Sequence, residues 1–597
     1  MSLSSTTKDK LASATIVSIF FLLAASAIAQ EEPNPDTDGT FIERVAVDIV
    51  NVEVYVSDKQ GNPVNGLTRD AFVVSEDGRP VEVVNFYRVA EGQADRGLEE
   101  EAESLAQEEP AGKPSQLQDE AILVPESQRL HLVIYVDNYN IHPLNRNRVF
   151  KRLRVFLHDN VKRGDQVLVA SYDRSLHIRQ PFTSSPDTVG KALSEVERMT
   201  GQAVARESER SQAVKDIFES DSVHVALSYA KNFAENQYHE MNNALNALRE
   251  MLDSLAGLPG RKMLVHVSDG LAMVPGQDLY QAVQQRFADI SAMGVGHSYD
   301  LSRRYMQVIA NANSNRVSFY TIDAGGLRTQ SGMGAEQAAI DAPMAATRAV
   351  ESVRMNNLQD TLIMMANRTG GQYIINTNDV LPGLERFARD IGNYYSLGYR
   401  APVSNRGRYH KIEVRLREES PGWKLRYREG YRDKSLEAAI EDSVRAFLVH
   451  GHETNPLDVS VDVGVQSPTG DGNIAVPIRI RVPMEKIVLL PRGDFYEGRL
   501  RLYFGATDQE GRDAELQELP YELRIPKSSI EMARGDEVAR VIDATMRPGP
   551  HKLVVAVRDE ISEERSVVGR YVTVGNRGEL KEDEQPVLPP SLDFRKQ

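Results

Sequence analysis

Four aspartates in this chain directly follow apolar segments, at points where a strand is expected to end and the backbone to turn. Asp137 follows LHLVIYV, and Asp269 follows MLVHVS. Asp173 follows QVLVASY, and Asp323 follows VSFYTI. In an open parallel sheet, ligands bind beyond the carboxyl ends of the strands. Because Mg²⁺ prefers carboxylate, hydroxyl and water oxygens, the four carboxylates predict a rim that could hold a divalent cation.

The same four positions also have a simpler interpretation. An aspartate at a strand-to-helix turn often caps the next helix, because its carboxylate accepts N–H bonds at the positive end of that helix. Capping requires no ligand and no cation. From the residues alone, both interpretations stay open for each of the four carboxylates.

Sequence patterns of common catalytic centres are absent from the chain. It contains no H-E-x-x-H, G-x-S-x-G or G-x-x-x-x-G-K-[ST] motif. Its 12 histidines are scattered, and neither His239-Glu240 nor His450-Gly451-His452 belongs to a convincing ligand set. With no cysteine, the chain has no disulfide, thiolate metal site or cysteine nucleophile. We therefore expect that the protein is not an enzyme.

The centre of the chain alternates between buried-strand and helix patterns. Apolar runs predict strands at 130–136, 166–172, 261–270, 316–323 and 371–376, with a more polar edge strand at 176–182. Helical patterns cover about 144–162, 186–199, 223–257 and 345–368, and helix-like sequence also follows the 261–270 strand to about 311. This alternation predicts an α/β domain over residues 129–400, doubly wound around a mainly parallel sheet with helices on both faces.

Strand patterns flank this centre on both sides. Residues 45–89 predict a small β domain that includes a hairpin at Asp77-Gly78. Residues 401–433 predict a β extension, and 457–576 predict a β-sandwich-like domain. The other segments predict a disordered stretch (30–44), a solvated acidic linker (90–128), a helical connector (434–456) and a loose tail (577–597).

Residues 1–29 have the pattern of a secretory signal peptide. Lys8 and Lys10 precede an apolar run, and Ala27-Ile28-Ala29 forms a small-x-small cleavage site. An uncleaved anchor is the alternative; no later stretch reaches the length of a transmembrane helix. The protein is therefore expected to be exported to the periplasm, the outer surface or the medium. Its net charge of -16 argues against nucleic-acid partners.

Several of these segments together resemble a known family. YVDNYN (135–140), LPGRKMLVHVSDG (258–270) and VSFYTIDAGGL (317–327) resemble a von Willebrand factor A domain. With NYYSLGYR (393–400), LRYREGYRD (425–433) and the N-terminal β segment, the chain is similar to the acidobacterial "VWFA-related" group of exported proteins. The resemblance covers about residues 45–433 and implies a von Willebrand factor A-like fold for the central domain.

The resemblance also implies a metal site, which this chain matches only in part. The wider family uses Asp-x-Ser-x-Ser after the first strand, a Thr on a later loop, and an Asp after a later strand. Asp137 and Asp269 match the two aspartates, but Tyr139 and Ile141 replace the serines. The Thr position falls near Glu240–Asn242, where no Thr is present. The residues that could supply replacement oxygens are Asn138, Asn140 and Asn242.

The expected function is protein–protein binding or adhesion outside the cytoplasm, through a degenerate site for Mg²⁺ or another divalent cation. Tyr139, Asn242, Asp173 and Asp323 are expected on the ligand-binding rim, and the protein partner is unidentified. One alternative is a structural envelope or scaffold protein without metal binding. A metal-dependent hydrolase at the Asp137–Asp269 rim is less favoured, because no nucleophile–base pair supports it.

Overall fold

The computed structural model describes residues 49–90, 93–95, 129–161, 164–289, 291–328, 344–401, 407–418, 422–470, 472–512 and 516–575. All of them belong to the compact unit Val47–Gln597. The predicted signal peptide, the disordered stretch, most of the acidic linker and the tail lie outside the described residues. Within the described ranges, no helix has the length and apolar character needed to cross a bilayer.

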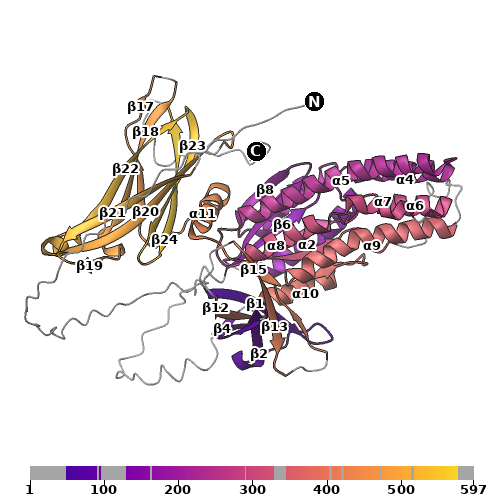
Figure 1. Ribbon diagram of the computed structural model, residues 1–597, viewed down its shortest axis with the longest axis horizontal. Coiled ribbons are helices and arrows are strands. Elements are labelled where there is room, and N and C mark those ends of the chain that lie inside the picture. Colours follow the sequence, from indigo (N-terminus) through magenta and orange to yellow (C-terminus); the bar gives the residue numbers. More distant parts are fainter. Residues whose placement is uncertain are drawn as a thin grey trace, which may run out of the picture. The chain divides into compact units, whose positions relative to one another are not determined.

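The central sheet has six strands, and all but one of its pairings are parallel (Figure 1). Only β8 is antiparallel to its neighbour, β7. The inner strands are almost entirely buried, which explains why their sequences are continuous apolar runs. Across the sheet the order is β11 (Tyr373–Ile374), β10 (Val317–Asp323), β9 (Arg261–Ser268), β6 (Leu130–Val136), β7 (Gln166–Tyr172) and β8 (Leu176–Thr183).

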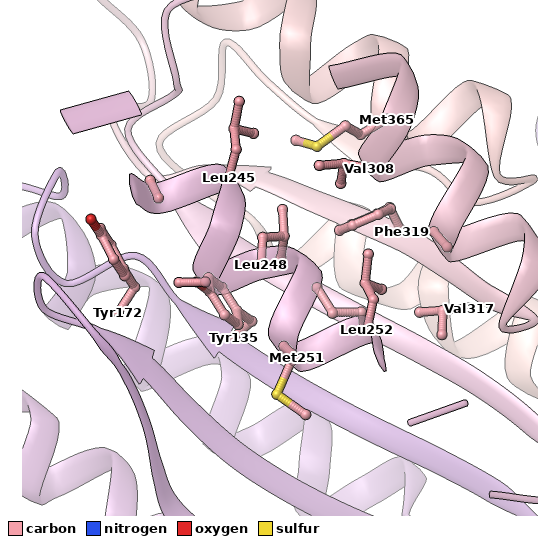
Figure 2. Close-up of a cluster of buried hydrophobic side chains, with 14 of the residues drawn as sticks. Tyr135, Tyr172, Leu245, Leu248, Met251, Leu252, Val308, Val317, Phe319 and Met365 are labelled. Atoms are coloured by element: carbon pink, nitrogen blue, oxygen red, sulfur yellow. The ribbon is translucent and has the colours of Figure 1, made fainter. Parts of the chain in front are cut away.

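Helices cover both faces of this sheet. On one face, alternate side chains of β6 and β7 pack against α2 (Pro143–Asn160), α3 (Pro186–Glu197) and α10 (Leu381–Gly392). The other face packs against α5 (Val223–Ser254), α8 (Ser302–Ser314) and α9 (Met344–Arg368). Figure 2 shows this second core, where Leu245 and Leu248 of α5 lie near Tyr135 and Phe319 of the sheet.

A helical extension continues beyond the sheet and includes one helix that the sequence did not predict. This helix, α4 (Ala203–Glu219), packs against α5 and α6 (Gln277–Phe287). The second half of α5 covers the sheet, whereas its first half joins α4, α6 and α9 in a separate apolar cluster. The alanines of that first half, Ala226, Ala230 and Ala234, are fully buried and let the helices approach closely. The extension therefore stands next to the edge where β6, β9 and β10 end.

The predicted N-terminal β domain and the predicted β extension form one structure, which corrects the proposed boundaries. Strand β1 (Ile49–Ser57) pairs with β12 (Tyr394–Arg400), and β12 also pairs with β4 (Val83–Ala90). Strand β2 (Phe72–Glu76) pairs with β13 (Tyr409–Leu416). The NYYSLGYR strand was assigned to the α/β domain, but its alternate side chains complete the core around β1. The other strands of this β domain are β3 (Arg79–Val81), β5 (Gln93–Asp95), β14 (Lys424–Arg426) and β15 (Gly430–Arg432).

The C-terminal region consists of two antiparallel sheets that share one apolar core. The first sheet contains β16 (Ser460–Val463), β17 (Ser467–Pro468), β18 (Ile474–Pro483) and β22 (Glu537–Met546). The second contains β19 (Leu490–Arg492), β20 (Phe495–Asp508), β21 (Gln517–Pro526), β23 (Gly549–Asp559) and β24 (Arg565–Val574). Helix α11 (Leu436–His450) occupies the predicted connector and packs on β23 and β24.

Candidate functional site

The parallel sheet brings the ends of β6, β9 and β10 to one edge. The backbone N–H of Asp137 donates to the Val267 carbonyl at 3.0 Å, which continues the β6–β9 pairing by one residue. On the other side of β9, the N–H of Ala324 donates to the Ser268 carbonyl at 2.8 Å. The aspartates at these strand ends therefore lie close together, as their positions after apolar runs predicted.

Asp137 is almost completely buried and its carboxylate is held by side chains of the protein. The Ser268 hydroxyl donates to Oδ2 at 2.9 Å. The Asn140 amide donates to Oδ1 at 2.9 Å and to Oδ2 at 3.0 Å. Burial raises the pKa of Asp137 to about 6, although these donors oppose the shift. Both carboxylate oxygens are thus occupied by hydrogen-bond donors.

A positive side chain from α4 lies over this network. Arg206 donates to the Asn140 amide oxygen and forms an ion pair with Glu240 of α5 at 2.7 Å. Its guanidinium lies 5.4 Å from the centre of the Tyr139 ring, and the Tyr139 hydroxyl donates to Glu240 at 2.8 Å. Arg206 also lowers the pKa of Asp137 electrostatically. The fold therefore provides its own cation beside Asp137.

The Asp269 carboxylate caps helix α2 with one of its oxygens, whereas the other oxygen accepts no hydrogen bond from the described residues. Oδ2 accepts from the His142 backbone N–H at 2.9 Å and from the Asn145 amide at 3.0 Å, both at the start of α2. Oδ1 is buried and has no hydrogen-bond partner among the described residues. Burial raises the pKa of the Asp269 carboxyl. Among Asp137, Asp269 and Asp323, this is the carboxylate oxygen that receives no hydrogen bond from the described residues.

Asp323 is held entirely by its surroundings. Its side chain is fully buried, with Oδ1 accepting from Arg328 at 2.9 Å and from the Gly325 N–H at 2.9 Å. Oδ2 accepts from Gln359 of α9 at 2.8 Å. Arg328 also donates to the Asp269 carbonyl at 2.7 Å. Asp323 therefore positions Arg328 at the rim and is not itself on the surface of the site.

Three other predicted site residues, Asn138, Asn242 and Asp173, make contacts elsewhere or lie outside the network around Asp137. The Asn138 amide oxygen accepts from Arg146 and is fully buried. Asn242 donates to the Tyr238 carbonyl and accepts from Arg304. Asp173 is half-buried at the end of β7. None of the three lines the cavity described next.

A cavity of about 340 Å³ opens at the edge of the sheet. Of the eight predicted site residues, Asn140 and Asp269 line it. Its other walls come from the start of α2, from the loop that carries Arg328, and from α4, α5 and α9. Charged side chains from α4 and α9 alternate there with apolar ones such as Phe233, Met241 and Leu358.

The contribution of α4 to the site was not predicted from the sequence. Arg206, Glu207 and Arg210 all line the cavity. Arg210 is buried and pairs with Asp278 at 2.5 Å and with Glu351 at 2.7 Å, which joins α4 to α6 and α9. The available signal was the i, i+4 spacing of the two arginines beside Val214, Ile217 and Phe218, which shows a helix with one apolar face.

The adhesion-type metal site implied by the resemblance does not fit these residues. Tyr139 and Ile141 occupy the two serine positions; Ile141 is fully buried and has no ligand atom. Glu240, near the missing threonine, is already bound to Tyr139 and Arg206. Elsewhere in the described chain, three potential ligand atoms for a metal do lie within 4.8 Å of one another, on Glu76, Asp77 and His410 of the β domain.

Comparison of the chain with protein-family models and with curated proteins gives no match. Similar solved structures include BatB from Bacteroides thetaiotaomicron, with 10% identity, 44% of this chain and 97% of that chain covered, and a TM-score of 0.21. An aerotolerance-related membrane protein from Bacteroides fragilis has 11% identity, with 44% of this chain and 98% of that chain covered and a TM-score of 0.20. Manganese-loaded TRAP protein from Plasmodium vivax has 10% identity, with 51% of this chain and 94% of that chain covered and a TM-score of 0.21. Likenesses at this level assign no function to this chain.

Proposed function

We propose that this chain is an exported binding protein whose α/β domain holds a partner protein at the edge formed by β6, β9 and β10, without a metal ion. One observation carries the proposal. The three most exposed large apolar side chains described in the α/β domain are Leu144, Leu327 and Val204, at 74%, 59% and 56% exposure. Each is the chain neighbour of a residue that lines the cavity: Asn145, Arg328 and Ala203, respectively.

The composition of this rim matches that of protein interfaces. Exposed apolar side chains gathered at one site mark surfaces that another protein covers. Arginine is enriched at such surfaces, and Arg206 and Arg328 both line the cavity. Asp269 also lines the cavity, and its buried Oδ1 is an acceptor that has no donor among the described residues.

We propose binding without a metal ion because hydrogen-bond donors of the protein already occupy the Asp137 carboxylate. A cation there would have to displace the Asn140 amide and approach Arg206, and the electrostatic repulsion from Arg206 opposes it. The proposed protein is also not an enzyme. Of the described residues that line the cavity, none is Ser, Thr, Cys, Tyr or Lys, so the cavity offers no hydroxyl, thiol or amine nucleophile.

Site-specific photo-crosslinking tests the proposal. A photoreactive phenylalanine analogue is placed at Leu327 or Val204, in the full chain expressed in the organism that encodes it. Val155 of α2, which is 48% exposed and away from the cavity, is the matched control. We expect the same partner protein to be captured from both rim positions, in the exported fraction, with equal yield in the presence of a chelator.

Four other outcomes would count against parts of this proposal. Equal capture from Val155 would mean that the rim is not the binding surface. Absence of any partner at both rim positions would favour the alternative, a structural envelope protein. Loss of capture on chelation would show that a metal ion takes part in binding after all. Capture in the cytoplasmic fraction alone would contradict export.

A further inference from the structure

We propose that the β domain contains a Zn²⁺ site formed by Glu76, Asp77 and His410. Glu76 ends β2, Asp77 begins the turn to β3, and His410 lies on β13. The site is distinct from the rim of the α/β domain and independent of the function proposed for it. It uses one imidazole nitrogen and two carboxylate oxygens, a donor set that suits Zn²⁺.

The distances between the ligand atoms fit a tetrahedral ion. His410 Nδ1 lies 3.0 Å from Asp77 Oδ2 and 3.4 Å from Glu76 Oε1. With metal–ligand bonds of about 2.0–2.1 Å, neighbouring ligands of a tetrahedral Zn²⁺ are about 3.3 Å apart. The three atoms all lie within 4.8 Å of one another. A small shift of the Asp77 side chain, which is 43% exposed, therefore completes three corners of the tetrahedron.

Hydrogen bonding alone does not account for this arrangement. Nδ1 can donate a single proton, yet two carboxylate oxygens are aimed at it. Nε2 of the same ring has no hydrogen-bond partner among the described residues, and Asp433 Oδ2 lies 3.6 Å from it. Three carboxylates thus surround one buried imidazole. A divalent cation could bind the imidazole and two of these carboxylates at the same time.

The surroundings hold each ligand in place as they do in known metal sites. The hydroxyls of Tyr399 and Tyr431 donate to Glu76 Oε2 at 2.7 and 3.0 Å, leaving Oε1 directed at His410. Asp433 stands where a metal-bound histidine commonly donates its other N–H. The Lys411 N–H donates to Asp77 Oδ1 at 2.8 Å, which leaves Oδ2 directed at His410.

The position of the site indicates a structural role. Asp77 and His410 are 333 residues apart in the chain, and the site lies where β2 and β13 pair. The chain has no cysteine, so no disulfide can join these strands. A metal ion would cross-link the first and last parts of the β domain, and its binding energy would add to the stability of that domain. The exposed side of Asp77 leaves a route for entry and a fourth position for water.

Zinc titration of the chelator-treated full chain, followed by calorimetry and thermal unfolding, tests the site. We expect one Zn²⁺ per chain and a higher midpoint of thermal unfolding with Zn²⁺ bound. Asp77→Asn and His410→Gln should each weaken binding at least about 100-fold, and Asp433→Asn about 10- to 100-fold. His158→Gln is the matched control, because His158 and Asp159 form an exposed pair at 3.1 Å and should leave binding unchanged.

Asp77→Asn keeps the test valid even if His410→Gln fails to fold, since residue 77 lies in an exposed turn. Absence of saturable Zn²⁺ binding in the wild-type chain would overturn the proposal, and so would equal affinity in wild type and Asp77→Asn. Asp137→Ala tests whether Zn²⁺ binds at the rim of the α/β domain instead, and this variant should bind Zn²⁺ like the wild type. Failure of the zinc site would leave the crosslinking result at Leu327 unaffected.

Discussion

At the scale of single residues, the same aspartates that look like metal ligands in the sequence serve the protein in three different ways. Asp137 is a buried acceptor for Asn140 and Ser268. Asp269 caps α2 and retains one free oxygen, and Asp323 positions Arg328. The carboxyl ends of parallel strands are therefore a place where buried polar groups gather, whether or not a cation binds there.

The raised pKa of Asp137 gives a prediction about stability and pH. The carboxyl has a pKa of 3.8 when unperturbed and about 6 in the folded chain. Because the folded state favours the protonated form, its contribution to stability is fully present below pH 3.8 and is lost as the pH rises through about 6. Relative to Asp137→Asn, the free energy of unfolding of the wild type should fall by about 2–3 kcal/mol between these limits.

Urea unfolding of both proteins across this pH range, with chelator present, measures that difference. Taking the difference between the two proteins removes the contributions of other titrating groups. A difference that stays constant with pH would contradict the buried, metal-free description of Asp137. A difference of opposite sign, with the wild type gaining stability as the pH rises, would mean that a cation or a stronger donor stabilises the ionised carboxylate.

The sequence predicted which residues lie at the ends of the strands, but it did not predict contacts between residues that are far apart in the chain. That Asp137, Asp269 and Asp323 share one edge followed from the strand patterns, because parallel strands end on the same side. That Arg206 lies over Asn140 did not follow, because the two are 66 residues apart and no periodic pattern joins them. A cation supplied by the chain itself can only be found once α4 is placed.

At the scale of elements, the buried strands were predicted to within a residue or two. The strand predicted at 130–136 is β6, and the helix predicted at 223–257 is α5, which ends at Ser254. Continuous apolar runs bounded by turns fix such elements locally. Helix α4 was missed because Arg206–Gln212 contains no apolar residue, and its burial comes from α5 and α6.

An ion pair between two elements leads to a second stability prediction. Arg426 of β14 binds both oxygens of Asp390 of α10, at 2.7 and 2.8 Å, and Asp390 is mostly buried. Arg426→Met should lower the free energy of unfolding by about 3 kcal/mol, because it leaves the carboxylate without its cation. Arg368→Met is the matched control: the Arg368–Glu429 pair is exposed and 3.4 Å long, so its loss should cost at most about 1 kcal/mol.

Chemical denaturation monitored by fluorescence and circular dichroism compares these two variants with the wild type. Similar losses for both would show that burial does not distinguish the pairs. Asp390 keeps donors from Tyr320 and Gln372 in the Arg426 variant, at 2.9 and 2.6 Å, so the fold should survive and the difference should remain measurable.

At the scale of the whole molecule, the main departure from the sequence prediction is the position of β12. Its sequence directly follows the helices of the α/β domain, so continuity along the chain assigned it there. In the structure it pairs with β1 and β4, more than 300 residues earlier, and completes the core of the β domain. Strand partners at that separation depend on tertiary packing, and alternation within one strand does not specify them.

This arrangement predicts how fragments of the chain behave. A fragment of residues 129–400 keeps β12 but removes both of its partners, which exposes Tyr395, Leu397 and Tyr399, each at most 2% exposed in the full chain. An unpaired strand with apolar side chains is a template for aggregation. We expect this fragment to aggregate, whereas residues 47–433 should remain monomeric in size-exclusion chromatography.

A third fragment, residues 129–392, separates two explanations of that aggregation. It lacks β12, so it has no unpaired strand, although Arg261 loses the Tyr394 ring that its guanidinium contacts at 3.8 Å. If the unpaired strand causes aggregation, 129–392 should be more soluble than 129–400 despite being shorter. If 129–392 aggregates equally, the α/β domain depends on the β domain for its stability and not only for the pairing of β12. A monomeric 129–400 with an unchanged unfolding midpoint would contradict the domain boundary described above.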